Sequence, residues 1–245
     1  SQKIDVQSYR QRALHRLAYR NHGTHESLVT NQSVEAAAGM AGIRWWEIRN
    51  PGGTPVLYQE GTYAPGVSDG VHRWMGSIAQ DFAGNMGLGY SASSATVFPS
   101  VRYTGRLAGD PLGQMPLGEG EIIAGTGSNT ATNARWGDYT SMNIDPVDDC
   151  TFWYVNQYTP VTSVAGWRLR IGAFRFNECG LRLGNTSLNV NEAGPSTDSF
   201  PVTLYPAPTS NVSFTLTFDS ANIEVDAGSG FGPSPRTLTL TPANA

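Results

Sequence analysis

The densest group of residues able to do chemistry lies in "ARWGDYTSMNIDPVDDCTFWY", residues 134–154. An arginine can hold a carboxylate through two parallel hydrogen bonds, and aromatic rings can stack on a sugar. Clustered carboxylates bind hard cations such as Ca²⁺. Asp145, Asp148 and Asp149 are therefore candidate calcium ligands, although an acidic hairpin turn has the same composition. The stretch is either an active site or a structural signature that recurs in the chain.

A related stretch upstream favours the structural signature. Residues 61–81 align with residues 125–145, since both begin with Gly-Thr, reach Arg-Trp and run through an alternating strand to an aspartate. Arg73-Trp74 corresponds to Arg135-Trp136, and Asp81 to Asp145, at a spacing of 62 to 64 residues. Further strands are expected, in matched positions of the two copies, at 55–61 and 121–127, 85–93 and 150–158, and 99–106 and 166–176.

A weaker third copy is expected at the front of the chain. Residues 25–34 take the place of the strand that contains Arg73-Trp74, and residues 42–50 take the place of the strand at 99–106. On this alignment, residues 12–21 are outer strands of a preceding unit.

A repeat of this length with about four short strands is typical of a β-propeller blade. The sequence thus predicts about three blades in residues 1–179. Propellers close with four or more blades, so we expect the remaining blades on another chain or on a lost segment of the same precursor. An open stack would leave apolar faces exposed at its two ends.

The composition changes after Cys179. Residues 180–245 lack Trp and alternate Thr, Ser and Val with turn residues, which predicts a small immunoglobulin-like or Calx-β-like β-sandwich, truncated or complete. The whole chain is therefore expected to be all-β. Its two cysteines, Cys150 and Cys179, fit a single disulfide, and a disulfide indicates an exported, extracellular protein.

Charge and hydropathy exclude some classes of partner. The net charge is −4 and no basic run occurs, so no nucleic acid partner is expected. No apolar run approaches the roughly 20 residues of a membrane-spanning helix. His22, His25 and Glu26 would suit zinc only on a helix, whereas their sequence predicts loop and strand.

Five segments resemble secreted bacterial proteins with sialidase-like (BNR-type) propellers: residues 19–29, 42–49, 72–81, 98–106 and 135–154. Such enzymes use an arginine cluster for a carboxylate, a tyrosine nucleophile, a glutamate base and an acid. The resemblance implies those roles, loosely, for Arg73 and Arg135, Tyr139, Glu26 and Asp138. The Asp-box of that family is degenerate here, since only its aspartate remains.

The favoured function is a non-catalytic extracellular module for binding or assembly, with a glycan or protein ligand at the channel mouth. Arg73, Arg135, Trp74 and Trp136 are the candidate ligand-binding residues, and calcium is the candidate cofactor. A sialidase-like glycoside hydrolase, completed by missing blades and using Glu26, Asp138 and Tyr139, is the alternative. A structural component of a surface layer or filament is the second alternative.

Overall fold

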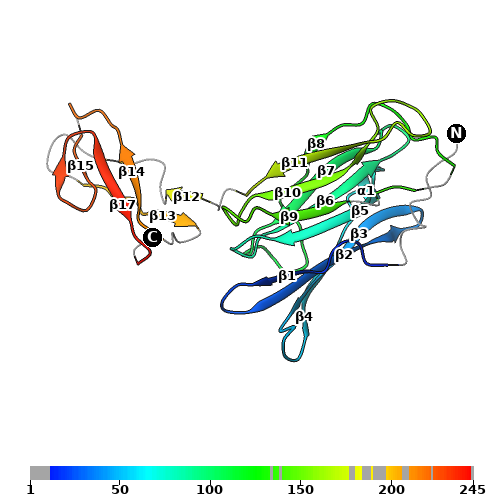
Figure 1. Ribbon diagram of the computed structural model, residues 1–245, viewed down its shortest axis with the longest axis horizontal. Helices are drawn as coiled ribbons and strands as arrows, with labels where there is room; N and C mark the ends of the chain where they lie inside the picture. Colours follow the sequence, from blue (N-terminus) through cyan, green and yellow to red (C-terminus); the bar gives the residue numbers. More distant parts are fainter. Residues whose placement is uncertain are drawn as a thin grey trace. The chain divides into compact units, whose positions relative to one another are not determined.

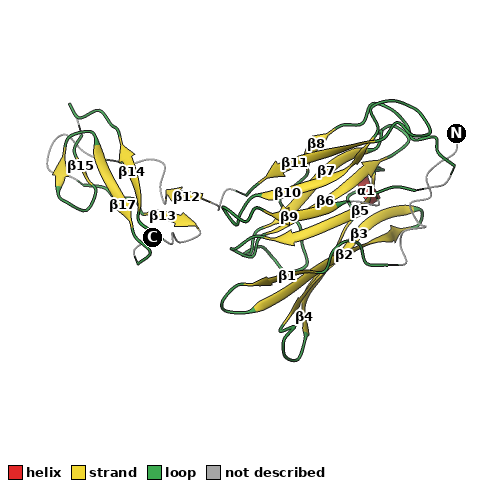
Figure 2. Ribbon diagram, in the orientation of Figure 1, coloured by secondary structure: helices red, strands yellow, loops and turns green. Residues whose placement is uncertain are grey.

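The chain folds almost entirely into antiparallel β-sheet. The computed structural model describes residues 12–132, 135–137, 140–176, 180–183, 189, 197–205, 210–221 and 223–243. These residues form seventeen strands and one short helix (Figures 1 and 2), so the predicted all-β class is confirmed. No helix in this part of the chain is long and apolar enough to cross a membrane.

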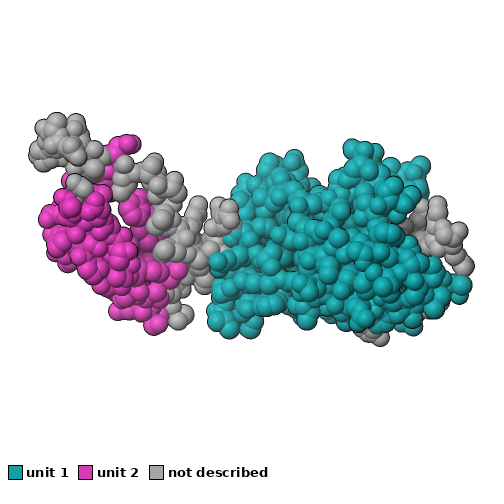
Figure 3. All heavy atoms as spheres, turned by 90° about the horizontal axis from the view of Figure 1, so that it is seen from above, with its two compact units in different colours: residues 1–176 teal, residues 177–245 magenta. Residues whose placement is uncertain are grey.

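The chain divides into two compact units. Unit 1 comprises residues 1–176 and unit 2 comprises residues 177–245 (Figure 3). The division falls close to the change in composition at Cys179, and each unit is described by itself.

Three meandering sheets make up unit 1. The first contains β1 (Ala18–Asn21), β2 (Glu26–Ala37), β3 (Met40–Arg49) and β4 (Val56–Tyr63), paired in that order. Helix α1 (Gly66–Asp69) leads to the second sheet, β5 (His72–Gln80), β6 (Met86–Ser93), β7 (Ser100–Arg106) and β8 (Gly120–Ile123). The third sheet has three strands, β9 (Ser141–Ile144), β10 (Phe152–Tyr158) and β11 (Arg168–Phe174).

The first strands of the three sheets run side by side in the same direction. The Ser77 hydroxyl, on β5, donates to the backbone oxygen of His15 at 2.8 Å and accepts from the backbone N–H of Met142 on β9 at 2.8 Å. Further along, Arg20 on β1 donates to the backbone oxygen of Gln80. Consecutive propeller blades are also meanders whose first strands lie side by side, and the propeller itself stays a prediction. The described sheets do not close into a ring or barrel.

This arrangement corrects the alignment of the first copy. Residues 25–34, which form most of β2, were expected to match β5, but β2 runs antiparallel to it. The Ser27 hydroxyl donates to the Gln80 side chain, and Met75 N–H donates to the Ser33 hydroxyl. The strand that matches β5 is β1, which belongs to the first sheet and not to a preceding unit. The match of residues 42–50 with 99–106 agrees with the structure, since β3 and β7 are both third strands.

The same side-chain cap ends each first strand. Asn21, Asp81 and Asp145 each accept a hydrogen bond from the backbone N–H two residues on, at 2.8, 3.0 and 2.8 Å. This is the Asx-turn, in which a short polar side chain replaces a backbone acceptor in a tight turn. Asparagine and aspartate side chains make the same turn. The first copy therefore keeps the turn at Asn21 but lacks the aspartate that marks the other two copies in the sequence.

Aromatic residues over glycines hold the second and third sheets together. A Cβ atom added at Gly87 would lie 2.6 Å from Phe152, and one added at Gly89 would lie 2.4 Å from Tyr154. Both separations are shorter than van der Waals contact, so only glycine lets the sheets approach this closely. Phe152 and Tyr154 are fully buried in this core with Ala79, Val101 and Met142.

The outer faces of the first and third sheets carry apolar rows. Across the first sheet, the register places Tyr19, Leu28, Ile48 and Leu57 in one row, and Tyr19 and Leu57 are 56% and 54% exposed. The third sheet turns Trp153, Val155, Ile171 and Leu169 outward, with Trp153 44% and Ile171 65% exposed.

Unit 2 contains three two-stranded antiparallel sheets in its described residues. β12 (Gly180–Leu183) pairs with β13 (Val202–Tyr205), β14 (Val212–Leu216) with β17 (Arg236–Leu240), and β15 (Val225–Asp226) with β16 (Phe231–Gly232). Residues 186–192, where alternating residues predict a further strand, lie outside the described residues apart from Asn189. A β-sandwich in this unit stays a prediction.

Candidate functional site

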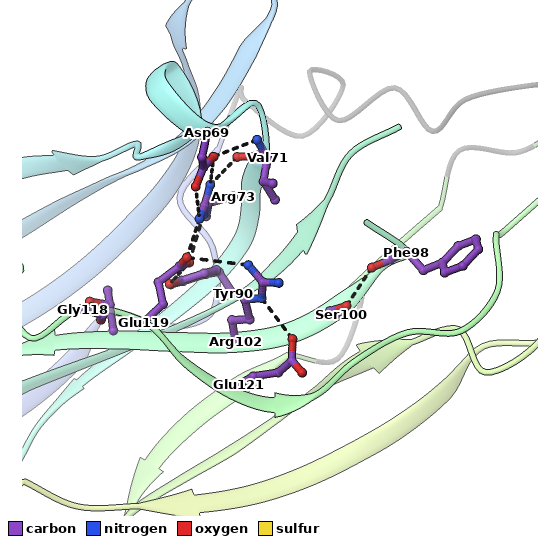
Figure 4. Close-up of polar contacts among 11 residues, drawn as sticks. Asp69, Val71, Arg73, Tyr90, Phe98, Ser100, Arg102, Gly118, Glu119 and Glu121 are labelled. Atoms are coloured by element: carbon purple, nitrogen blue, oxygen red, sulfur yellow. Dashed lines mark hydrogen bonds and ion pairs between the residues drawn. The ribbon is translucent and has the colours of Figure 1, made fainter. Parts of the chain in front are cut away.

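Arg73 lies at the centre of a buried ionic network (Figure 4). Its guanidinium makes five hydrogen bonds: two to the Asp69 carboxylate, two to the Glu119 carboxylate and one to the Val71 carbonyl. An arginine has five N–H donors, so every donor of Arg73 is in use. A ligand carboxylate would have to displace Asp69 or Glu119 to reach it.

Glu119 links this arginine to β6 and β7. It accepts a hydrogen bond from the Tyr90 hydroxyl at 2.6 Å and lies 3.7 Å from the Arg102 guanidinium. Burial alone would raise the pKa of Glu119, but hydrogen bonds from Arg73 and Tyr90 outweigh it and hold the pKa below its ordinary value. The carboxylate is therefore ionised at neutral pH and serves as the counter-ion of Arg73.

The Tyr90 hydroxyl donates to Glu119, which Arg73 and Arg102 also contact, a set suited in principle to nucleophilic chemistry. Tyr90 is fully buried, and burial raises the pKa of its phenol well above the ordinary value. A phenol so far from ionisation and out of contact with solvent is a poor nucleophile. The network therefore stabilises the second sheet and is not arranged for catalysis.

Trp74 and Trp136 pack against each other, as their matched places in the repeat suggest. Both are buried, their ring centroids are 5.5 Å apart, and their indole N–H groups donate to Ser93 and Ser91 respectively. These rings are packing between neighbouring sheets and offer no stacking platform to a ligand. Arg135, beside Trp136, is exposed.

The backbone after each Arg-Trp pair also repeats. Met75 and Gly137, which follow the two tryptophans, both have left-handed backbone, with φ of 48° and 68°. Left-handed backbone is uncommon for a residue with a side chain. The shared conformation at Met75 therefore supports the alignment of the second and third copies.

Glu26 does not join the other sequence-predicted residues. It begins β2 opposite Asn21, at the end of the sheets where β5 reaches Gln80, whereas Arg73 begins β5 at the other end. Glu26 accepts a hydrogen bond from Tyr19 at 2.6 Å. Asp138 and Tyr139 lie outside the described residues, so the predicted catalytic set is not assembled in this part of the chain.

The three candidate calcium ligands serve the β9–β10 hairpin instead. Asp145 caps the turn and accepts from the Trp153 indole, Asp148 accepts from the Cys150 and Thr151 backbone, and Asp149 pairs with Arg20. Within the described residues, no group of three His, Cys, Asp or Glu side chains could hold a metal ion. In the described part of the chain, the three aspartates therefore do not converge on a calcium site.

The predicted disulfide cannot be followed to both ends. Cys150 is fully buried, and Cys179 lies outside the described residues. The disulfide stays a prediction.

Sequence reasoning missed a second group of buried polar residues, between the first and second sheets: Glu47, Gln59, Gln80 and Arg106. The sequence did contain one sign of the Glu47 position. Alternate residues of a strand face the same side, so β3 places the Glu47 carboxylate on the same face as Ile43 and Trp45. Gln80 carries no comparable signal, because its partner Ser27 comes from another sheet, and Arg106 is held by backbone oxygens of the loop that follows β7.

No family model matches the chain, and no curated protein or solved structure is significantly similar to it. The resemblance to secreted sialidase-like propellers therefore stays a prediction from the sequence.

Proposed function

We propose that this chain is a non-catalytic extracellular assembly module, whose stack of sheets is extended by docking a further antiparallel sheet. The observation that carries the proposal is the pair of apolar outer faces on the first and third sheets. The candidate catalytic residues also support a non-catalytic role. Every donor of Arg73 is bonded within the chain, and Glu26 lies away from Arg73.

The packing of the third sheet on the second, within unit 1, is an example of how a further sheet could dock. The third sheet covers the face of the second with a row of large side chains, Phe152 and Tyr154, over small ones. Its own outer face presents Trp153 and Ile171 in the same alternating positions, uncovered. Burial of apolar area contributes roughly 25 cal/mol per Å², so such a face favours association with another sheet.

In purified protein the sheet that covers this face comes from a second copy of the chain. A face of one copy set against the opposite outer face of the next is a head-to-tail contact, which closes into a ring or continues as a filament. The surface-layer alternative is the filament form of the same proposal. Export is part of the proposal and rests on the predicted pairing of Cys150 and Cys179.

Native mass spectrometry of the full chain tests the proposed assembly. A second measurement under denaturing conditions without reductant tests the proposed export. The proposal predicts native masses at multiples of the 26.3 kDa chain. It also predicts a denatured chain lighter by two hydrogen atoms than the reduced one, as a disulfide requires. A species that stays at 26.3 kDa at every concentration would contradict assembly, and a fully reduced mass would contradict export.

A further inference from the structure

A small cavity lined mainly by polar residues opens between the first and second sheets, at the end where the Asx-turns lie. Its volume is about 60 Å³. It is lined by residues from β3 and β4 of the first sheet, from the ends of β5 and β7, and from the turn after β5, among them Glu47, Arg49, Tyr58, Gln59, Gln80 and Arg106. The cavity is separate from the Arg73 network, because none of its lining residues belongs to that network.

Arg106 brings a buried positive charge to this cavity. Its side chain is 1% exposed, and its Nε and Nη2 donate to the backbone oxygens of Gln114, Asp110 and Pro111. Among the described residues, Arg106 forms no ion pair, and no hydrogen bond of its Nη1 is found. A buried cation that has only carbonyl partners lacks the counter-charge that usually offsets its loss of hydration.

Arg49 adds a second guanidinium. Its Nε donates to Glu47 at 2.8 Å, and its planar head lies 3.3 Å from the centre of the Tyr58 ring, which fixes its orientation. The two Nη atoms of Arg49 make no hydrogen bond to another described residue. Glu47 is already held by Arg49 and by the Gln59 amide at 2.6 Å.

The two arginines at the cavity are paired unequally. Glu47 makes an ion pair with Arg49, whereas no described carboxylate pairs directly with Arg106. Burial lowers the pKa of Arg106, and the nearby charge of Arg49 lowers it further, while Asp110 and Glu47 act in the opposite direction. Two like charges beside one cavity repel each other, and an anion placed between them would remove that cost.

We propose that this cavity binds a single carboxylate group, held by the free donors of Arg49 and Arg106. Guanidinium groups match the planar, two-oxygen geometry of a carboxylate. A volume of about 60 Å³ equals the liquid share of about two water molecules. It is far below the roughly 300 Å³ at which sites for whole small molecules begin. The cavity therefore admits one functional group, either from a free small acid or from an acidic sugar whose ring stays outside.

The test is an amide chemical-shift titration of the full chain with sodium acetate, followed at Ala83, Gly84 and Ala108 around the cavity. Sodium chloride at equal ionic strength is the reference. The proposal predicts a saturable shift with acetate and none with chloride. Arg49→Gln, at a partly exposed side chain, should weaken acetate binding about tenfold, the loss of one charge-assisted contact.

Arg44→Gln is the matched control. It removes the same charge from the same strand, but Arg44 pairs with Glu60 and does not line the cavity. Acetate binding should be unchanged in this variant. A linear shift, an equal response to chloride, or equal weakening by both substitutions would overturn the proposal.

A parallel titration with methyl β-glucuronide separates the two sources of the carboxylate. Tighter binding of the glucuronide than of acetate assigns the site to an acidic sugar. Binding of acetate alone assigns it to a free small acid. If native mass spectrometry shows only monomers, the acetate test still stands, because the cavity lies between two sheets of one chain.

Discussion

Arg73 is a buried cation whose partners all come from its own chain. The sequence identified the residue correctly as exceptional, because an arginine before a tryptophan recurs in the repeat. It could not show the partners, since Glu119 lies 46 residues away in a glycine-rich loop with no distinctive pattern. Sequence reasoning therefore found the position and proposed ligand binding, whereas the structure gives every N–H of the guanidinium an internal acceptor.

Substituting Arg73 should destabilise the fold. Arg73→Met leaves the Asp69 and Glu119 carboxylates without their cation, and removing one partner of a buried ion pair costs about 3 kcal/mol. Arg44→Met is the control, because its pair with Glu60 lies outside the network, is partly exposed and should contribute less than about 1 kcal/mol. Urea unfolding measures both. An Arg73→Met protein within about 0.5 kcal/mol of wild type, as for a surface substitution, would show that the network is not structural.

The meandering sheet is the element that repeats, and its first strand was predicted well where two signals coincided. Arg-Trp at the start and aspartate at the end located β5. The aspartate also located the end of β9, whereas β9 begins only at Ser141, after Arg135-Trp136. In the first copy both signals are missing, and the alternation of β2 was taken for the first strand. Alternation reveals a strand but not its direction, and direction is what distinguishes β1 from β2.

The turn aspartate of the second sheet makes a prediction about pH. Burial raises the pKa of Asp81 to about 6, although hydrogen bonds from Asn85 and Ala83 oppose the shift. An unfolded aspartate titrates near 4, so between about pH 4 and pH 6 the folded chain keeps a proton that the unfolded chain has lost. The free energy of unfolding should therefore fall by roughly 3 kcal/mol from this group as pH rises through that window.

Asp81→Asn should remove that pH dependence while keeping the turn, since Asn21 makes the same turn in the first sheet. Unfolding free energies at pH 4.5 and pH 7 should therefore differ less in the variant than in the wild type. Equal differences in the two proteins would contradict the buried, proton-binding role of Asp81.

At the scale of the whole molecule, three sheets stack in unit 1 with an apolar row on each outer face. Composition and repeat length were sufficient to predict the class and the stacked meanders, because both follow from local alternation and turns. They were not sufficient to predict the cavity between the first two sheets, which depends on side chains from four strands meeting in space.

The central claim, that the outer face of the third sheet is an assembly surface, is tested most directly by sedimentation velocity of three forms of the full chain. Wild type should associate as concentration rises, and Ile171→Asp should stay monomeric, because it places a charge on the apolar outer face, midway along β11. Val67→Asp, a comparable change at a side chain 60% exposed on α1 and away from that face, should associate like wild type. A wild-type chain that remains a monomer throughout, or an Ile171→Asp chain that associates as wild type does, would contradict the claim.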